Sequence, residues 1–289
     1  GPLSFTTIAS HESSKSNRRT FRGGAAQDTL SLKDYQFLRN TYFFLDEFYR
    51  VNLPDYRQLA SGARVPGSDF VDSGSLQVYI NDFNTINDPE LLARPGVARV
   101  ASSDVSEDDE VVCINPNGLF VANSGCFEEG TWHRLDPDDD YTVVEGAGYI
   151  ILNRTVPDRH ALAVSYRTRG GTDVDPEQFG ETRGDTLELK LIKARDARPG
   201  FPTWDLEWKN VYRIATGFSQ GRKFDPSTLE VQVLKEIAGQ ESEPSQGGTS
   251  YLQIFGLDER GQDPGSAPDR VIDRDYIGLD DIRGHLIFP

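Results

Sequence analysis

The stretch YTVVEGAGYIILNRTVPDRHALAVSY, residues 141–166, alternates short apolar runs with turn-forming residues. The apolar runs are rich in β-branched and aromatic residues and have the length of strands: residues 141–144, 149–152 and 162–166. Gly, Pro and Asp supply the turns between them. Short strands at this spacing are typical of a β-sandwich. We therefore expect a mainly β, α+β chain with a β-sandwich-like domain around this meander.

The chain before residue 60 has a different periodicity. Between residues 30 and 59, the apolar side chains of Leu32, Tyr35, Leu38 and Tyr42 recur at steps of three and four. This spacing predicts one or two amphipathic helices as N-terminal helical elements. Residues 1–29 begin with a Gly-Pro-Leu-Ser sequence typical of a cleaved tag and continue as a polar stretch, so we expect a tag scar and a flexible leader there.

The polar, Gly-containing segment at residues 171–185 predicts a linker between two domains. Residues 30–170 would then hold the helical elements and the β-sandwich-like domain. Residues 186–289 would form a second β-rich domain, opening with the alternating strand pattern LELKLI at residues 187–192.

The charge balance excludes some partners. Acidic residues number 46 against 30 basic ones, a formal net charge of -16. A field of this sign repels phosphate backbones and anionic lipid surfaces, so we expect no nucleic-acid partner. No apolar window reaches the roughly 20 residues of a membrane helix, so we expect no direct membrane insertion by this chain.

Cys113 and Cys126 are the two cysteines of the chain, and the turn-forming sequence INPNG follows Cys113 directly. A hairpin at this turn would bring the two thiols together, which makes them a disulfide candidate and indicates an oxidising compartment. Two buried free thiols remain the alternative. Zinc is disfavoured because a structural site needs four ligands and His133 is an isolated addition.

The sequence offers no catalytic constellation. It lacks a Gly-x-Ser-x-Gly elbow and a phosphate-binding loop, and its four histidines stand in ordinary contexts. We predict no catalytic residue and no enzyme activity. Two alternative hypotheses remain. One is a hydrolase with acidic catalytic residues, and the other is a free-standing carbohydrate-binding or adhesive surface module that uses Trp132, Trp204 and Trp208.

One loop is a candidate metal site. Residues 257–273 space several carboxylates along a Gly- and Pro-rich sequence, and the oxygen ligands would be Asp258, Asp263, Asp269 and Asp273. Calcium prefers such oxygen ligands, although the spacing does not match an EF-hand. An acidic solvent-exposed loop is the alternative, and we expect no other cofactor.

Several strings, taken in order, resemble the SprA/Sov family. TWDLEWKNVY at residues 203–212 is similar to a PTWDLxxKNxY signature, with matches at Thr203, Trp204, Asp205, Leu206, Lys209 and Asn210. YFFLDEFYR at 42–50, GYIILN at 148–153, DRVID at 269–273 and GHLIFP at 284–289 resemble further family elements. The segment holding both cysteines and the acidic stretch at 104–110 depart from the pattern.

The resemblance implies a soluble domain fragment of a giant outer-membrane translocon of the type nine secretion system, related to gliding motility. It implies structural roles for the matched positions and no catalytic residues. The expected partners are other envelope or secretion-system proteins, secreted substrates and the remainder of the parent chain. The expected location is the cell envelope, associated with the outer membrane.

Overall fold

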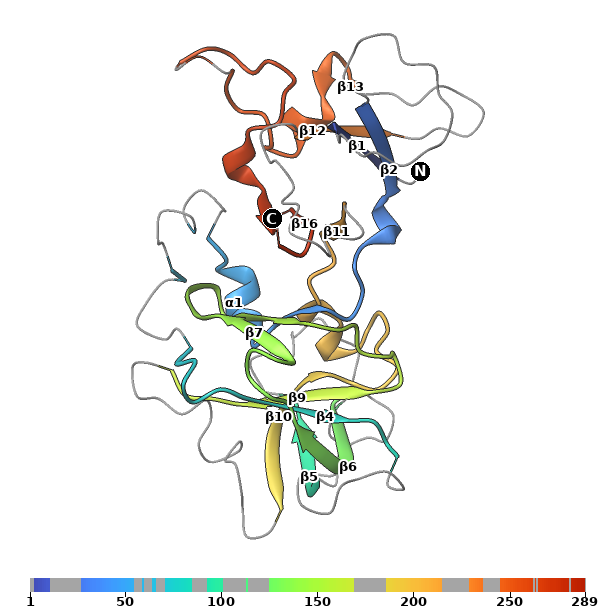
Figure 1. Ribbon diagram of the computed structural model, residues 1–289, viewed down its shortest axis with the longest axis vertical. Coiled ribbons are helices and arrows are strands. Elements are labelled where there is room, and N and C mark those ends of the chain that lie inside the picture. The colour runs from blue at the N-terminus through green and yellow to red at the C-terminus, as the bar shows by residue number, and fades with distance from the viewer. Residues whose placement is uncertain are drawn as a thin grey trace. The chain divides into compact units, whose positions relative to one another are not determined.

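The computed structural model describes residues 3–10, 27–54, 59, 64–65, 71–84, 93–100, 113, 125–168, 186–214, 229–235, 245–261, 263, 265–280 and 282–288. The chain divides into two compact units, which we treat separately. The central unit comprises Arg39–Pro54 and Gln58–Lys209, and the terminal unit comprises Gly1–Leu38 and Asn210–Pro289. Figure 1 shows strands as the main regular elements of both units.

The central unit is built on a closed sheet with the strand order β10-β5-β6-β4-β9. Its strands are β4 (Gln77–Asn81), β5 (Ala93–Arg99), β6 (Phe127–Arg134), β9 (Ala161–Ser165) and β10 (Leu187–Lys193). β9 pairs with both β4 and β10, which closes the sheet, and β10 runs parallel to β5.

Alternation along the strands fills the core of the closed sheet. Leu187, Leu189 and Leu191 of β10 are fully buried in one cluster with Trp132 of β6. Successive side chains of a strand point to opposite faces, so every second residue enters this core. Gly96 lets β5 approach β10 closely, because a Cβ there would lie 2.7 Å from the Cβ of Leu187.

A second sheet of the central unit has the order β3-β8-β7, formed by β3 (Tyr42–Phe44), β7 (Tyr141–Val144) and β8 (Tyr149–Leu152). β7 and β8 form a hairpin through the 3-10 turn η3 (Glu145–Ala147), and Gly148 takes a positive φ of 66° after that turn. Such a backbone conformation favours glycine, which has no Cβ.

The β-rich prediction is confirmed, but a β-sandwich is not. The predicted meander is split: its first two strands form the β7–β8 hairpin, whereas the third, β9, belongs to the closed sheet. The expected N-terminal helices are not confirmed either. The described part of residues 30–59 holds the end of strand β2 (Gln27–Lys33), the 3-10 turn η1 (Asp34–Gln36), strand β3 and the five-residue helix α1 (Glu47–Val51). Tyr42–Phe44 is buried at all three positions because it pairs with β8, so sheet pairing overrides the helical spacing.

Helix α1 is joined to the closed sheet by a buried ion pair. Asp46 caps the helix by accepting the N–H of Phe48 at 2.8 Å, and its other carboxylate oxygen contacts the ammonium of Lys190 on β10. The Lys190 side chain is 1% exposed. Removing one partner of such a pair leaves an uncompensated buried charge, so this contact ties the two segments firmly.

The described residues of the terminal unit form three small sheets, in the orders β12-β1-β2, β11-β16-β15 and β13-β14. Its elements are β1 (Leu3–Ser10), β2 (Gln27–Lys33), β11 (Val211–Arg213), β12 (Leu229–Lys235), β13 (Ser245–Gln246), β14 (Thr249–Ser250), α3 (Tyr251–Ile254), η6 (Arg274–Tyr276), β15 (Gly278–Asp280) and β16 (His285–Ile287). A core cluster that includes Tyr212, Val233, Leu252, Leu286 and Phe288 lies within this unit.

The division into units differs from the expected domains. β10 belongs to the closed sheet, so the chain after the predicted linker returns to the central unit. The linker itself, residues 171–185, lies outside the described residues. Residues 3–10 form β1 between β2 and β12, where a flexible leader was expected, because pairing on both sides satisfies their backbone groups. Within the described ranges, no helix has the length and apolar character needed to cross a membrane.

Candidate functional site

The family-like motif at residues 203–210 follows β10 and forms a 3-10 turn, η4 (Pro202–Leu206). Pro202 begins the turn, where its fixed φ is favourable and its missing N–H costs nothing. The buried hydroxyl of Thr203 accepts the N–H of Ala194 at 3.1 Å, and Leu206 is fully buried. Asp205 is exposed and lies 3.7 Å from the ammonium of Lys209. The turn is thus anchored just after the end of β10 by packing and by this hydrogen bond.

The side chain of Lys209 contacts other residues of the same motif. Its ammonium donates to the carbonyls of Trp204 and Glu207 and lies 4.5 Å from the centre of the Trp204 ring. Burial lowers the pKa of Lys209, and the nearby carboxylates of Glu207 and Asp205 oppose this shift. Asn210 begins the terminal unit, where its carbonyl accepts the N–H of Phe288 at 2.9 Å.

The motif also pairs with β3. Phe43 and Glu207 form an antiparallel bridge, and the N–H of Trp208 donates to the carbonyl of Tyr42 at 2.9 Å. The buried carboxylate of Glu207 accepts the N–H of Asn40 at 2.5 Å. Burial raises the pKa of Glu207, although this hydrogen bond opposes the shift.

The three tryptophans offer no open stacking platform. Trp132 is fully buried and donates its indole N–H to the carbonyl of Gly96 at 3.2 Å. Trp208 is 5% exposed and packs against Phe44 and Tyr149. Trp204 is half-buried and lies under the ammonium of Lys209. A sugar ring needs an exposed aromatic face, so the carbohydrate-binding alternative finds no support in these side chains.

The cysteines are brought together as the sequence suggested. Cys113 and Cys126 form a disulfide with their Cα atoms 5.5 Å apart. Cys126 precedes β6 and packs in the core cluster of the closed sheet, with Cys113 against it. The turn predicted between the two cysteines lies outside the described residues.

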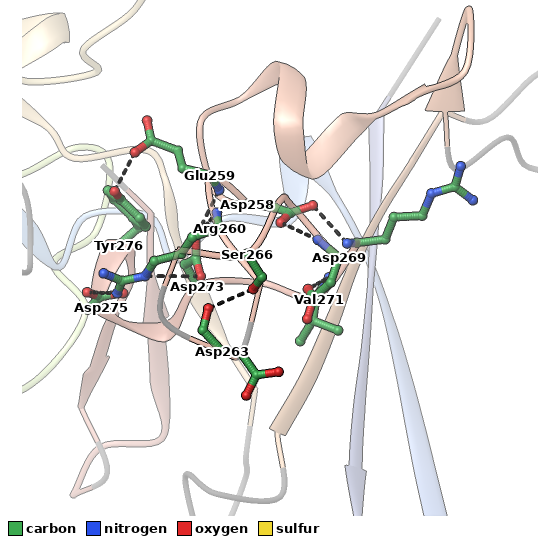
Figure 2. Close-up of polar contacts among 11 residues, drawn as sticks. Asp258, Glu259, Arg260, Asp263, Ser266, Asp269, Val271, Asp273, Asp275 and Tyr276 are labelled. Atoms are coloured by element: carbon green, nitrogen blue, oxygen red, sulfur yellow. Dashed lines mark hydrogen bonds and ion pairs between the residues drawn. The ribbon is translucent and has the colours of Figure 1, made fainter.

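The acidic loop at residues 257–273 uses its carboxylates to hold its own backbone (Figure 2). Asp258, which is almost fully buried, accepts the N–H groups of Asp269 at 3.2 Å and Arg270 at 2.9 Å. Asp273 accepts the N–H groups of Glu259 at 2.8 Å and Arg260 at 3.2 Å. These bonds connect the two ends of the loop, which explains its abundance of Asp.

The predicted calcium ligands are not gathered into a site. Asp263 is exposed, and the side chain of Asp269 accepts the N–H of Val271, two residues further on. The guanidinium of Arg260 lies between Asp273 and Asp275 and supplies positive charge there (Figure 2). Across the described parts of the chain, no group of three or more His, Cys, Asp or Glu side chains is placed to hold a metal ion.

A cavity of about 370 Å³ in the central unit was not anticipated from the sequence. It lies among β4, β6, β8 and the loops that follow β6 and β8, and its lining combines apolar and polar side chains: Ile80, Asp82, His133, Leu135, Asp140, Leu152, Arg154, Thr155, Val156, Pro157 and His160. These residues come from segments far apart in the chain, so only the fold brings them together.

The titratable groups that line the cavity differ in their pKa shifts and in their hydrogen bonds. Partial burial alone would raise the pKa of Asp140, but the N–H of Asp136 and the guanidinium of Arg154 outweigh it, so the pKa lies below its usual value. Burial lowers the pKa of His160, and its Nδ1 is buried without a hydrogen-bond partner in the described structure. His160 is therefore neutral at pH 7.

Lys193 holds the loop that carries His160 by hydrogen bonds to its backbone. This buried ammonium donates to the carbonyls of Asp158 at 2.8 Å and His160 at 2.5 Å. Burial lowers the pKa of Lys193 to about 8, against the opposing effect of nearby carboxylates. A register irregularity between Leu191 and Lys193 interrupts the alternation of β10 just before this contact.

No family model matches the chain, and no curated protein matches it.

Proposed function

We propose that this chain is a non-catalytic structural and interaction module of a giant outer-membrane translocon of the SprA/Sov kind, which serves type nine protein secretion and is related to gliding motility. In this proposal it resides in the cell envelope, associated with the outer membrane. Its partners are other envelope or secretion-system proteins, secreted substrates and the remainder of its parent chain.

The observation that carries the proposal is the packing around Trp208. Three of the strings that resemble the family lie far apart in the sequence, at residues 42–50, 148–153 and 203–212. They meet in the central unit, where Trp208 contacts Phe44 of the first string and Tyr149 of the second. Trp208 itself stands at an unspecified position of the PTWDLxxKNxY pattern, so the support comes from the packing together of the three family-like segments, whereas chance matches need not touch.

Two further features support the proposal. The Cys113–Cys126 disulfide suits an oxidising compartment outside the cytoplasm. The side chains of the motif are used for packing and for hydrogen bonds to the backbone, which fits a scaffolding role.

The non-catalytic part of the proposal rests on the cavity. A pair of catalytic carboxylates needs one group with a raised pKa to act as an acid. Of the two carboxylates that line the cavity, Asp140 is bound by Arg154 and has a lowered pKa. The other, Asp82, accepts the N–H of Asn84 at 2.9 Å.

Crosslinking in living cells tests the proposal. A photoreactive amino acid placed at Val51, an exposed position on α1, should capture secretion-system proteins or secreted proteins in transit. The same residue placed at the buried Trp132 position of the full-length parent protein serves as the control and should capture none. Identical sets of unrelated envelope proteins from both positions would refute the interaction function.

A further inference from the structure

The cavity beside β6 has walls that are fixed before any ligand arrives. The turn at residues 136–140 is tied to the loop after β8, because Asn153 donates its backbone N–H to the carbonyl of Asp140 and its side-chain amide to that of Asp138, both at 2.8 Å. Arg154 adds an ion pair to Asp140. Lys193 holds the far end of the same loop through the carbonyls of Asp158 and His160. A preorganised site loses little conformational entropy on binding.

The size of the cavity limits its occupant. Small-molecule sites range from about 300 to about 1,000 Å³. At about 370 Å³ this cavity is near the lower end of that range. It has room for one long side chain rather than for a folded segment of polypeptide.

The charges of the cavity favour a cation. Asp140 is neutralised by Arg154, whereas Asp82 forms no ion pair within the described part of the chain and has one oxygen engaged by the N–H of Asn84. Asp82 and His160 line the same cavity. Since His160 is neutral at pH 7, it does not repel a cation that approaches Asp82.

The planar imidazole rings in the lining favour a guanidinium over an ammonium. The lining includes the imidazoles of His133 and His160, and a planar guanidinium stacks on aromatic rings while donating hydrogen bonds in its own plane. The apolar side chains of Leu135, Val156 and Pro157 suit the methylene groups of a long side chain.

We propose that this cavity binds the side chain of an arginine from a partner polypeptide, with the guanidinium at Asp82 and the imidazoles and the methylene groups on the apolar wall. This rests on the proposed interaction function for the source of the arginine. The contact itself is a property of the isolated chain.

The test is an NMR titration of the labelled chain with Nα-acetyl-arginine methylamide and, as a matched neutral ligand of the same shape, Nα-acetyl-citrulline methylamide. The arginine ligand should shift the imidazole resonances of His133 and His160 in a saturable manner. The citrulline ligand should bind about tenfold more weakly, the loss expected for one partly buried charge contact. Equal shifts from both ligands, or none from arginine, would overturn the proposal.

Protein variants provide a second readout. Asp82→Asn removes the charge but retains an acceptor for the N–H of Asn84, so the fold should persist. It should weaken arginine binding about tenfold. Glu129→Gln, which removes an exposed carboxylate on β6 outside the cavity, should leave binding unchanged. Equal effects of the two variants would mean that the overall negative charge attracts the ligand, and the proposed site would be wrong.

The two proposals fail separately. If arginine binds as expected but crosslinking in cells captures no secretion component, the cavity assignment stands and the translocon function falls. If crosslinking succeeds and arginine does not bind, the translocon function stands and the cavity assignment falls.

Discussion

Trp208 stacks on Phe44, with ring centroids 4.9 Å apart and ring planes inclined by 28°. These residues belong to segments more than half the chain apart, and Tyr149 completes the group edge-on to Trp208 at 5.1 Å. The contact joins the segment that follows η4 to the β3-β8-β7 sheet of the central unit. It makes the tryptophan a part of the core and leaves its face closed to ligands.

Truncating this tryptophan should strongly destabilise the central unit. Trp208→Ala removes a buried aromatic side chain and leaves a cavity, which typically costs about 3 to 5 kcal/mol in the free energy of unfolding. Urea denaturation followed by circular dichroism measures the change. Trp204→Ala is the matched control and should cost clearly less, because Trp204 is half-buried. Similar losses from the two variants would contradict the role given to Trp208.

The disulfide should contribute measurably to stability. Cys113 and Cys126 are 13 residues apart, and crosslinking a loop of that size is worth about 3 kcal/mol in the chain-entropy model. The Cys113→Ser/Cys126→Ser double variant should therefore lower the melting temperature. Intact mass before and after reduction and alkylation establishes that the bond is present. Free thiols in oxidised protein would refute it.

Calcium should not stabilise the acidic loop. Asp258 and Asp273 already bind backbone N–H groups, and Arg260 supplies positive charge beside Asp273. The melting temperature should therefore be the same in calcium and in chelator. A calcium-dependent rise would mean that the loop rearranges around a cation.

Asp258 should matter for its hydrogen bonds. Asp258→Ala leaves two backbone N–H groups without their acceptor and should cost about 1 to 3 kcal/mol in the free energy of unfolding of the terminal unit. Asp263→Ala, at an exposed position of the same loop, should be close to neutral. Denaturant unfolding of both variants separates the two cases, and an equally large loss at Asp263 would contradict this account of the loop.

Acidification should weaken the terminal unit through His285. This residue of β16 is 4% exposed, and burial lowers the pKa of its imidazole to about 4, below the ordinary value of about 6.5. Between these two values the unfolded chain binds a proton that the folded chain does not. The free energy of unfolding therefore falls as the pH falls through this window, by up to about 1.4 kcal/mol per pH unit.

Urea unfolding between about pH 7 and about pH 5 measures this dependence. His285→Gln should lose the part of the slope that comes from this imidazole. If the variant and the unaltered chain show the same slope, the histidine is not responsible.

The sequence predicted the strands well where alternation was strong. Leu187, Leu189 and Leu191 mark β10, and the β7–β8 hairpin follows its turn residues. The assignment of strands to sheets could not be predicted, because it depends on pairing between distant segments such as β10 with β5. The helix predicted from the spacing around Tyr42 is wrong for the same reason, because β3 is formed by pairing with the distant strand β8.

The candidate sites were predictable to different degrees. The pairing of Cys113 and Cys126 was predicted from a turn sequence after Cys113; the disulfide is present, and the turn lies outside the described residues. The carboxylates of the acidic loop were noticed, but their hydrogen bonds to the backbone N–H groups of Arg260 and Arg270 were not visible in the spacing. The cavity could not be predicted at all, because Asp82, His133 and His160 meet only through the closed sheet and its loops.

The most direct test of the central claim is a quantitative comparison of secreted proteins in the organism that encodes this chain. Deleting the segment for residues 39–209 from the parent gene should deplete a defined set of secreted proteins from the medium and retain them in the cell. A parallel strain with Glu129→Gln should secrete normally. An unchanged set of secreted proteins in the deletion strain would contradict the assignment to a secretion translocon.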